Sequence, residues 1–301
     1  MQDHGGRLCW LGVGLGLLAG FFFMTDRARG EDPAGDEILA RFESMVTFNL
    51  DNPHVMPSSQ IDSLMQTVAD KPVGERIAFW ADFFYRLGRT QYLFGLDTGG
   101  YVKEGRPLDD YKTDCVLFVY RTTELGRSST AREAVQFAFG TRFYGASVEE
   151  AILPDGRVRY EDPSHLDYSE DIFRTGIWGK NVTASVGPLE PDPGNVLFAP
   201  DTLSFVPKSK IDESALQSGD IVYFVLDETN PKGKEARDAG VLISHLGIVK
   251  KSGDGVDLIH AAKVPLEGVY EGGKVEKVPL RAYLAAIDRF KGIVVTRIEE
   301  F

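Results

Sequence analysis

The chain has 301 residues, of which 43% are hydrophobic and 26% are charged. This composition is ordinary for a globular protein and suffices for one large domain or two small ones. The formal net charge of −12 argues against nucleic acid and anionic membrane surfaces as main partners, because both repel an acidic protein. The sequence shows no internal repeat, low-complexity tract or Pro-rich linker.

The N-terminus carries an apolar segment. Arg7 precedes an unbroken apolar run over residues 8–24, and a polar, charged stretch follows it. This run is short for a membrane-spanning helix, which needs about 20 residues, and long for a signal-peptide core of about 7–15. Because residues 28–30 loosely fit a small-x-small cleavage site, we expect residues 1–30 to be a signal peptide. The alternatives are a retained N-terminal anchor and a buried helix of a cytosolic protein.

The chain has two cysteines, Cys9 in the leader and Cys115. Cleavage near Gly30 would leave Cys115 alone, so that no internal disulfide could form. A free thiol in an oxidising compartment is a liability unless it is buried or used. Cys115 is therefore either an inert core residue or a nucleophile.

Helical patterns dominate the region after the leader. Apolar residues at helical spacing predict helices over residues 36–48 and 58–70, with Ser58 and Ser59 as the cap of the second. A third helix is predicted over residues 74–88. An irregular, Gly-rich loop over residues 89–112 then leads to Cys115. The next helix is predicted over residues 114–127, with Asp114 as its N-cap and Gly126 at its C-terminal end.

Residues 127–215 give the weakest pattern, with a turn predicted over residues 153–160. From residue 216 onward the pattern predicts strands over residues 218–227, 244–253, 256–264 and 291–301. Helices followed by a run of antiparallel strands are typical of an α+β fold.

Three residues could form a nucleophilic site. At a helix N-terminus, the helix dipole and free N–H groups lower the pKa of a thiol such as Cys115 from about 8.5 into the range of about 3.5–7.5. His245 and His260 lie on consecutive predicted strands joined by a turn at residues 252–255, so both can occupy one face. Such a set supplies a nucleophile, a base and a third group that orients the base.

Each of these residues also has a simpler interpretation. A cysteine flanked by apolar residues is more often part of a core, and a histidine on an apolar strand is usually a hydrogen-bonded core residue. Cys115, His245 and His260 could alternatively bind zinc, although the chain has no C-x-x-C or H-x-x-x-H element. The residues by themselves leave these alternatives open.

Five motifs occur in a fixed order along the chain: QYLFG, TDCVLFV, SGDIVYF, SHLGIV and LIHAA. This series resembles the signature of the NlpC/P60 cell-wall cysteine peptidases. Within that superfamily, the chain is most similar to a branch of N-acetylmuramoyl-L-alanine amidase-like proteins of unknown function, over residues 85–296. The resemblance implies a papain-like core in residues 85–301, with the nucleophile helix packed on an antiparallel sheet. Residues 31–84 would add N-terminal helices.

The resemblance also implies the roles of individual residues. Cys115 corresponds to the nucleophile, His245 to the general base and His260 to the residue that orients the base. Tyr92 matches a tyrosine that lies beside the nucleophile, where its hydroxyl could support the oxyanion together with the N–H of Cys115. Simple aromatic packing is the alternative for Tyr92.

Further polar residues are candidates for contacting the substrate. His165, Asp167 and Tyr168 form a polar cluster that we expect to line the groove, with a solvated loop as the alternative, and Asp114 is the fourth candidate. The resemblance implies hydrolysis of a peptidoglycan amide, at the muramoyl-L-alanine or a stem-peptide bond, with no metal or organic cofactor. The expected location is the periplasm or cell envelope, with membrane contact only through an uncleaved leader. A non-catalytic envelope scaffold and an acyl or peptidyl transferase are the alternatives.

Overall fold

The computed structural model describes residues 56–93, 112–142, 173, 176–192, 203–253 and 255–300. The leader, the helix predicted over residues 36–48 and the turn predicted over residues 153–160 lie outside these ranges. In the part of the chain that is described, none of the helices has the length and apolar character needed to cross a membrane.

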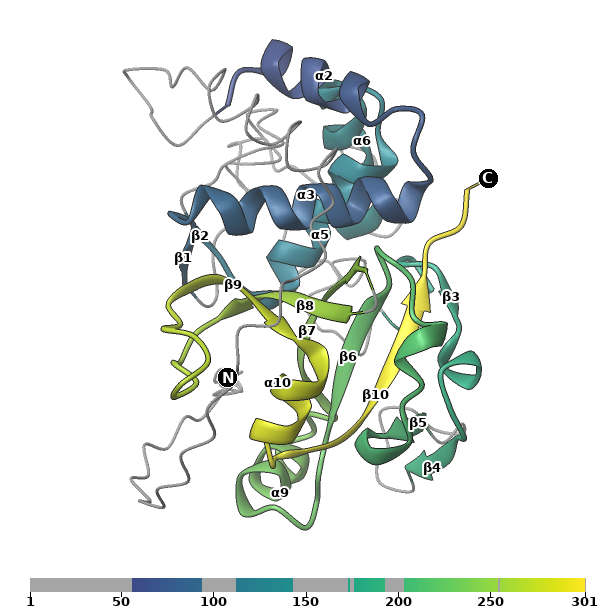
Figure 1. The fold of residues 1–301 in the computed structure, drawn as a ribbon, viewed down its shortest axis with the longest axis vertical. Coiled ribbons are helices and arrows are strands. Elements are labelled where there is room, and N and C mark those ends of the chain that lie inside the picture. Colours follow the sequence, from purple (N-terminus) through teal and green to yellow (C-terminus); the bar gives the residue numbers. More distant parts are fainter. Residues whose placement is uncertain are drawn as a thin grey trace, which may run out of the picture.

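A ten-stranded sheet forms the centre of the fold (Figure 1). The strands follow the order β2-β1-β9-β8-β7-β6-β10-β5-β4, and β3 pairs with β10. β1 and β2 run parallel, whereas the pairings from β9 through β4 are antiparallel, so the sheet agrees with the predicted α+β class. The strands are β1 (Gln91–Tyr92), β2 (Lys112–Thr113), β3 (Lys180–Asn181), β4 (Glu190–Asp192), β5 (Leu203–Pro207), β6 (Ile221–Leu226), β7 (Ile243–Ser252), β8 (Gly255–Ala262), β9 (Lys274–Pro279) and β10 (Phe290–Arg297).

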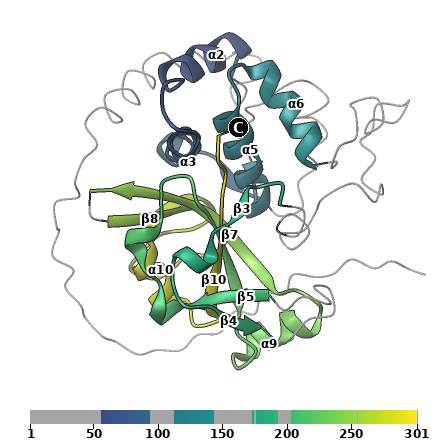
Figure 2. The same ribbon diagram turned by 90° about the vertical axis from the view of Figure 1, so that its right-hand side faces the viewer.

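Helices lie on both sides of the sheet. Four gather on one side, as Figures 1 and 2 show: α2 (Ser58–Thr67), α3 (Val73–Leu87), α5 (Cys115–Arg127) and α6 (Ala131–Arg142). On the other side, α10 (Leu280–Ala286) packs against β8 and β9, and α9 (Pro231–Asp238) lies in the connection from β6 to β7. Short 3-10 turns cover residues Thr183–Ser185, Lys208–Lys210 and Glu213–Ala215.

Strand β6 shows why both faces of the sheet are covered. All six of its residues are buried. Its odd-numbered residues belong to the core shared with α3 and α5, and its even-numbered residues belong to a second core shared with α10. A strand with alternate residues in two cores reads as a continuous apolar run, as this one does.

The helix ends test the predicted caps. The Asp114 carboxylate accepts a hydrogen bond from the N–H of Leu117 at 2.7 Å, which confirms Asp114 as the N-cap of α5. Gly88, with a φ of 64°, ends α3 as predicted. The predicted cap at Ser58 and Ser59 is wrong, because α2 begins directly after Pro57 and has no side-chain cap.

Gly126 is explained by packing between α3 and α5. The structure places it within the last turn of α5, which continues to Arg127. A Cβ atom at position 126 would lie 2.5 Å from Cγ1 of Ile77 on α3. The two helices can therefore approach this closely only because residue 126 has no side chain.

A buried carboxylate fastens α3 to the sheet. Asp82 is fully buried and lies 2.9 Å from Lys250 Nζ on β7 and 3.0 Å from Lys277 Nζ on β9. Arg86, one turn further along α3, donates a third hydrogen bond at 2.8 Å. Burial alone would raise the pKa of Asp82, but the charges and hydrogen bonds of the two lysines outweigh burial and lower it.

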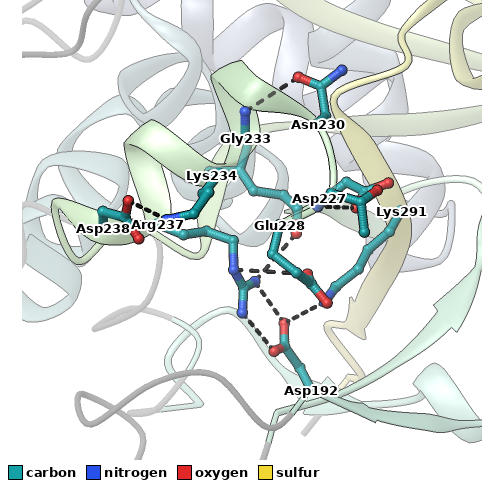
Figure 3. Close-up of polar contacts among 11 residues, drawn as sticks. Asp192, Asp227, Glu228, Asn230, Gly233, Lys234, Arg237, Asp238 and Lys291 are labelled. Carbon is teal, nitrogen blue, oxygen red and sulfur yellow. Dashed lines mark hydrogen bonds and ion pairs between the residues drawn. The ribbon is translucent and has the colours of Figure 1, made fainter.

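A second buried ionic cluster fastens α9 to β4 and β10 (Figure 3). Arg237 of α9 donates two hydrogen bonds, at 2.8 and 2.7 Å, to the carboxylate oxygens of Asp192. Lys291 Nζ lies 3.2 Å from the same carboxylate, and Glu228 contacts both cations. Burial raises the pKa of Asp192, but Arg237 and Lys291 together lower it below its usual value.

Candidate active site

Cys115 is the first residue of α5, and hydrogen bonds hold the backbone before it and the helix after it in place. It is 9% exposed and belongs to the core between α5 and the sheet. On one side, the Asp114 carboxylate caps the helix. On the other, Arg121 of α5 donates a hydrogen bond at 2.7 Å to the carbonyl of Lys112, in the strand that leads to the thiol. The helix packs against β7 and β8, which carry the two candidate histidines.

The structure brings these two histidines into direct contact. Nε2 of His245 on β7 lies 2.7 Å from Nδ1 of His260 on β8, a hydrogen-bond distance. Their exposed fractions are 8% and 1%. Because Nε2 of His245 takes part in this bond, Nδ1 is the ring nitrogen of His245 that remains for proton exchange with another group.

The His-x-Gly sequence and a register shift explain how the histidines reach this arrangement. A Cβ atom at Gly247, two residues after His245, would lie 2.9 Å from the Cβ of His260 and 2.8 Å from a carbonyl oxygen of β8. The register between β6 and β7 shifts after Phe224, the residue opposite His245. An irregularity of this kind changes the direction in which a neighbouring side chain points, here that of His245.

Aromatic rings enclose the histidine pair and keep it neutral. The ring of Phe224 stacks on His245 at 5.8 Å, and the ring of Tyr283 lies 6.0 Å from His245 and 4.9 Å from His260. Burial lowers the pKa of His260 to about 3. Burial, followed by the charges of His260 and Arg289, lowers the pKa of His245 well below 6.5. At pH 7 both imidazoles are therefore neutral, and His245 can accept a proton.

Tyr283 of α10 contacts both histidines. Burial and the charge of Tyr270 raise the pKa of the Tyr283 hydroxyl well above 10, and the charge of Cys115 raises it further. The thiol is thus within electrostatic range of a tyrosine that contacts both histidines. The motif pattern misses Tyr283 and Tyr270, because they reach the site only when α10 and the β8–β9 connection fold over β8. No local signal in the sequence marks that placement.

Tyr92 lies beside the start of α5. It pairs with Thr113 of β2, two residues before Cys115, and its N–H donates a hydrogen bond at 2.7 Å to the carbonyl of Gly273. Its partly buried side chain packs against the core that contains Cys115. This position suits the predicted contact with the oxyanion, which stays a prediction.

The predicted substrate-binding residues are only partly covered. His165, Asp167 and Tyr168 lie outside the described residues. Asp114 is described and caps α5, while its contact with substrate stays a prediction. Within the described ranges, no group of three or more His, Cys, Asp and Glu side chains could hold a metal ion.

A hollow of about 610 Å³ lies at the N-terminal end of α3. Its lining includes Gly74, Ser218, Arg297 and Glu300, but none of the candidate catalytic residues. The candidate site is therefore located by its chemistry and not by the shape of this hollow.

Comparison with known proteins supports the fold. No protein-family model matches the sequence, and no curated protein matches it either. A Legionella pneumophila protein of the DUF1460 family has a similar structure, with a TM-score of 0.53 and 16% identity over 81% of this chain and 94% of its own. A protein from Bacteroides uniformis, named an N-acetylmuramoyl-L-alanine amidase, gives a TM-score of 0.51 and 16% identity over 76% of this chain and 99% of its own. At these identities the similarity shows a shared fold.

Proposed function

We propose that the protein is a cell-envelope cysteine hydrolase that cleaves an amide bond of peptidoglycan, at the muramoyl-L-alanine linkage or within the stem peptide. The observation that carries this proposal is the 2.7 Å bond between His245 and His260, on strands against which the Cys115 helix packs. The NlpC/P60-like motif order and the fold shared with an amidase-named protein support the substrate class.

The proposed mechanism uses Cys115 as nucleophile and His245 as base. Neutral His245 takes the thiol proton at Nδ1 while the sulfur attacks the amide carbonyl carbon, forming a C–S bond and an oxyanion. The intermediate collapses as the C–N bond breaks, and His245 returns the proton to the leaving amine. Water, deprotonated by His245, then attacks the thioester, releases the carboxylate and restores the thiol.

His260 is proposed to orient the base. When Nδ1 of His260 accepts the bond, His245 carries its proton on Nε2 and presents a lone pair at Nδ1. The oxyanion would be bound by the backbone N–H of Cys115 at the start of α5 and by the Tyr92 hydroxyl. Neither step requires a metal or an organic cofactor. A leader in residues 1–30 would deliver this enzyme to its substrate outside the cytoplasm.

The proposal is tested by digestion of purified peptidoglycan and defined muropeptides, with products identified by mass spectrometry. The matched control is Cys115→Ser, which changes one atom of a buried side chain. Products that require Cys115 are expected. Release of the whole stem peptide from the muramoyl group would identify an amidase, and a cut within the stem an endopeptidase. If the wild-type chain yields no product from any of these substrates, the hydrolase proposal is wrong and a scaffold function is favoured.

A further inference from the structure

Arg289 stands out among the cations near the histidine pair. It precedes β10, and its backbone is held in place because the Asp227 N–H donates a 2.8 Å hydrogen bond to its carbonyl. Its guanidinium lies over the ring of Phe290, with Cζ 4.8 Å from the ring centroid. Phe290 in turn contacts Phe224, the residue that stacks on His245. Arg289 is therefore at the border of the candidate active site.

The guanidinium of Arg289 lacks a carboxylate partner among the described residues. Its Nε is buried without a hydrogen-bond partner, although the residue as a whole is only partly buried. No ion pair joins it to an acidic side chain in the described part of the chain. Arg237 and Arg297, by comparison, each form a bidentate pair with a buried aspartate. A guanidinium has five donors in a planar fork that matches a carboxylate, so Arg289 has donors available.

The Phe290 ring lies against the guanidinium of Arg289, and the acidic group that acts on nearby Tyr270 is the carboxylate of Glu276. The charge of Arg289 acts on His245, Tyr270 and Tyr283, which places it near the same groups that enclose the proposed catalytic centre. Burial raises the pKa of Tyr270 to about 12, so this tyrosine keeps its proton and can donate. An arginine with an unpartnered buried Nε, whose charge reaches two protonated tyrosines, supplies donors of the kind that bind an anion.

We propose that Arg289 binds a carboxylate of the substrate beside the scissile amide, so that the enzyme selects peptides with a free carboxylate there. This inference rests on the proposed hydrolase function, since a stem peptide carries carboxylates close to its amide bonds. Binding would satisfy the unpaired guanidinium and would hold the amide carbonyl against Cys115. In the proposed enzyme Arg289 determines specificity, while His245 and Cys115 perform the chemistry.

The test compares two forms of a muropeptide that the wild-type chain cleaves. One form has a carboxylate nearest the scissile bond, and the other has a carboxamide in its place. We expect the wild-type kcat/KM to favour the carboxylate by about 10- to 100-fold, the strength of a charge-assisted hydrogen bond. Arg289→Gln should remove this preference, mainly by raising KM for the carboxylate form, and Arg289→Lys should retain part of it.

Arg281→Gln is the matched control, because Arg281 lies on α10 of the same segment, is 79% exposed and pairs with Glu213. It should leave the preference intact. Arg289→Gln could instead shift the low-pH side of the kcat/KM profile equally for both substrates and keep the preference for the carboxylate. Arg289 would then only change the pKa of His245, and the proposal would be wrong. Equal cleavage of both substrates by the wild-type chain would also overturn it. Absence of cleavage of any muropeptide by the wild-type chain would instead refute the hydrolase function itself.

Discussion

The histidine pair and the Asp192 cluster are both buried and polar, but they differ in how completely their groups are paired. In the cluster, the Asp192 carboxylate binds Arg237 at two atoms and also contacts Lys291 (Figure 3). At the histidine pair, Nε2 of His260 is buried without a hydrogen-bond partner, and so is Nε of Arg289.

This difference separates polar groups that stabilise the fold from those available for chemistry. In the Asp192 cluster, both cations are paired with the carboxylate, so the cluster ties α9 to the sheet and leaves no group for a ligand. A buried polar atom without a partner lowers stability, and beside the candidate site such an atom is a group available to a ligand. The predictions below test this assignment of one region to catalysis and of the other to stability.

The largest expected effect is on catalysis. If His245 is the general base, His245→Ala should lower the rate of muropeptide cleavage by about 10⁴-fold or more, close to the effect of Cys115→Ser. Cleavage rates at saturating substrate measure this loss. Circular dichroism checks that the variant stays folded, since it removes the buried hydrogen-bond partner of His260. A loss of less than about 10-fold would contradict the role of His245 as general base.

The opposite result is expected at the Asp192 cluster. Asp192→Ala leaves Arg237 and Lys291 without their shared carboxylate, and should lower the free energy of unfolding by about 3–5 kcal/mol. Urea denaturation measures this change. Folded variant protein should cleave muropeptides at the wild-type rate. A clear loss of activity in the folded variant would show that the two regions are not independent.

Tyr92 should have an intermediate effect. Tyr92→Phe keeps the ring that packs on the core and removes only the hydroxyl. If that hydroxyl supports the oxyanion, kcat should fall by about 10²–10³-fold with little change in KM. Steady-state kinetics on a defined muropeptide distinguish this from simple packing, for which kcat would be unchanged.

The smallest expected effect is on the pH dependence of stability. The pKa of His260 is about 3 in the folded chain, against an ordinary histidine pKa of about 6.5 in the unfolded chain. Between these values the unfolded chain binds more protons, so stability falls as pH falls from 6.5 toward 3, by at most about 1.4 kcal/mol per pH unit for this residue. The lowered pKa of Asp192 reduces stability only below pH 4, as that carboxylate is protonated. Urea denaturation from pH 7 to 4.5 should therefore show a shallower loss for His260→Asn than for the wild-type chain.

Much of the fold is predictable from the sequence where the pattern is local. The β6, β7, β8 and β10 strands, the N-cap at Asp114 and the end of α3 at Gly88 all follow from apolar patterns and turn residues. The pattern does not predict β9, α9 or α10. α9 is polar along most of its length, and only its contacts with the sheet identify it as an element of the fold.

The candidate site likewise has features that the sequence predicts and features that it does not. The proximity of His245 and His260 is predictable, because two strands joined by a tight turn place neighbouring residues on one face. The positions of Tyr283 and Arg289 depend on how α10 and the start of β10 fold over the sheet, and no short motif encodes that. The fully paired state of Asp192 likewise depends on residues 45 and 99 positions away, Arg237 and Lys291.

The most direct test of the central claim is the rate at which Cys115 reacts with iodoacetamide at pH 6 in the native full-length chain. The reacted site is identified by peptide mapping, which separates Cys115 from Cys9, and the urea-unfolded chain is the reference. If His245 activates the thiol, Cys115 should react faster in the native chain than in the unfolded one, and His245→Ala should abolish the difference. Reaction of Cys115 only after unfolding would show an inert core cysteine and would contradict the account.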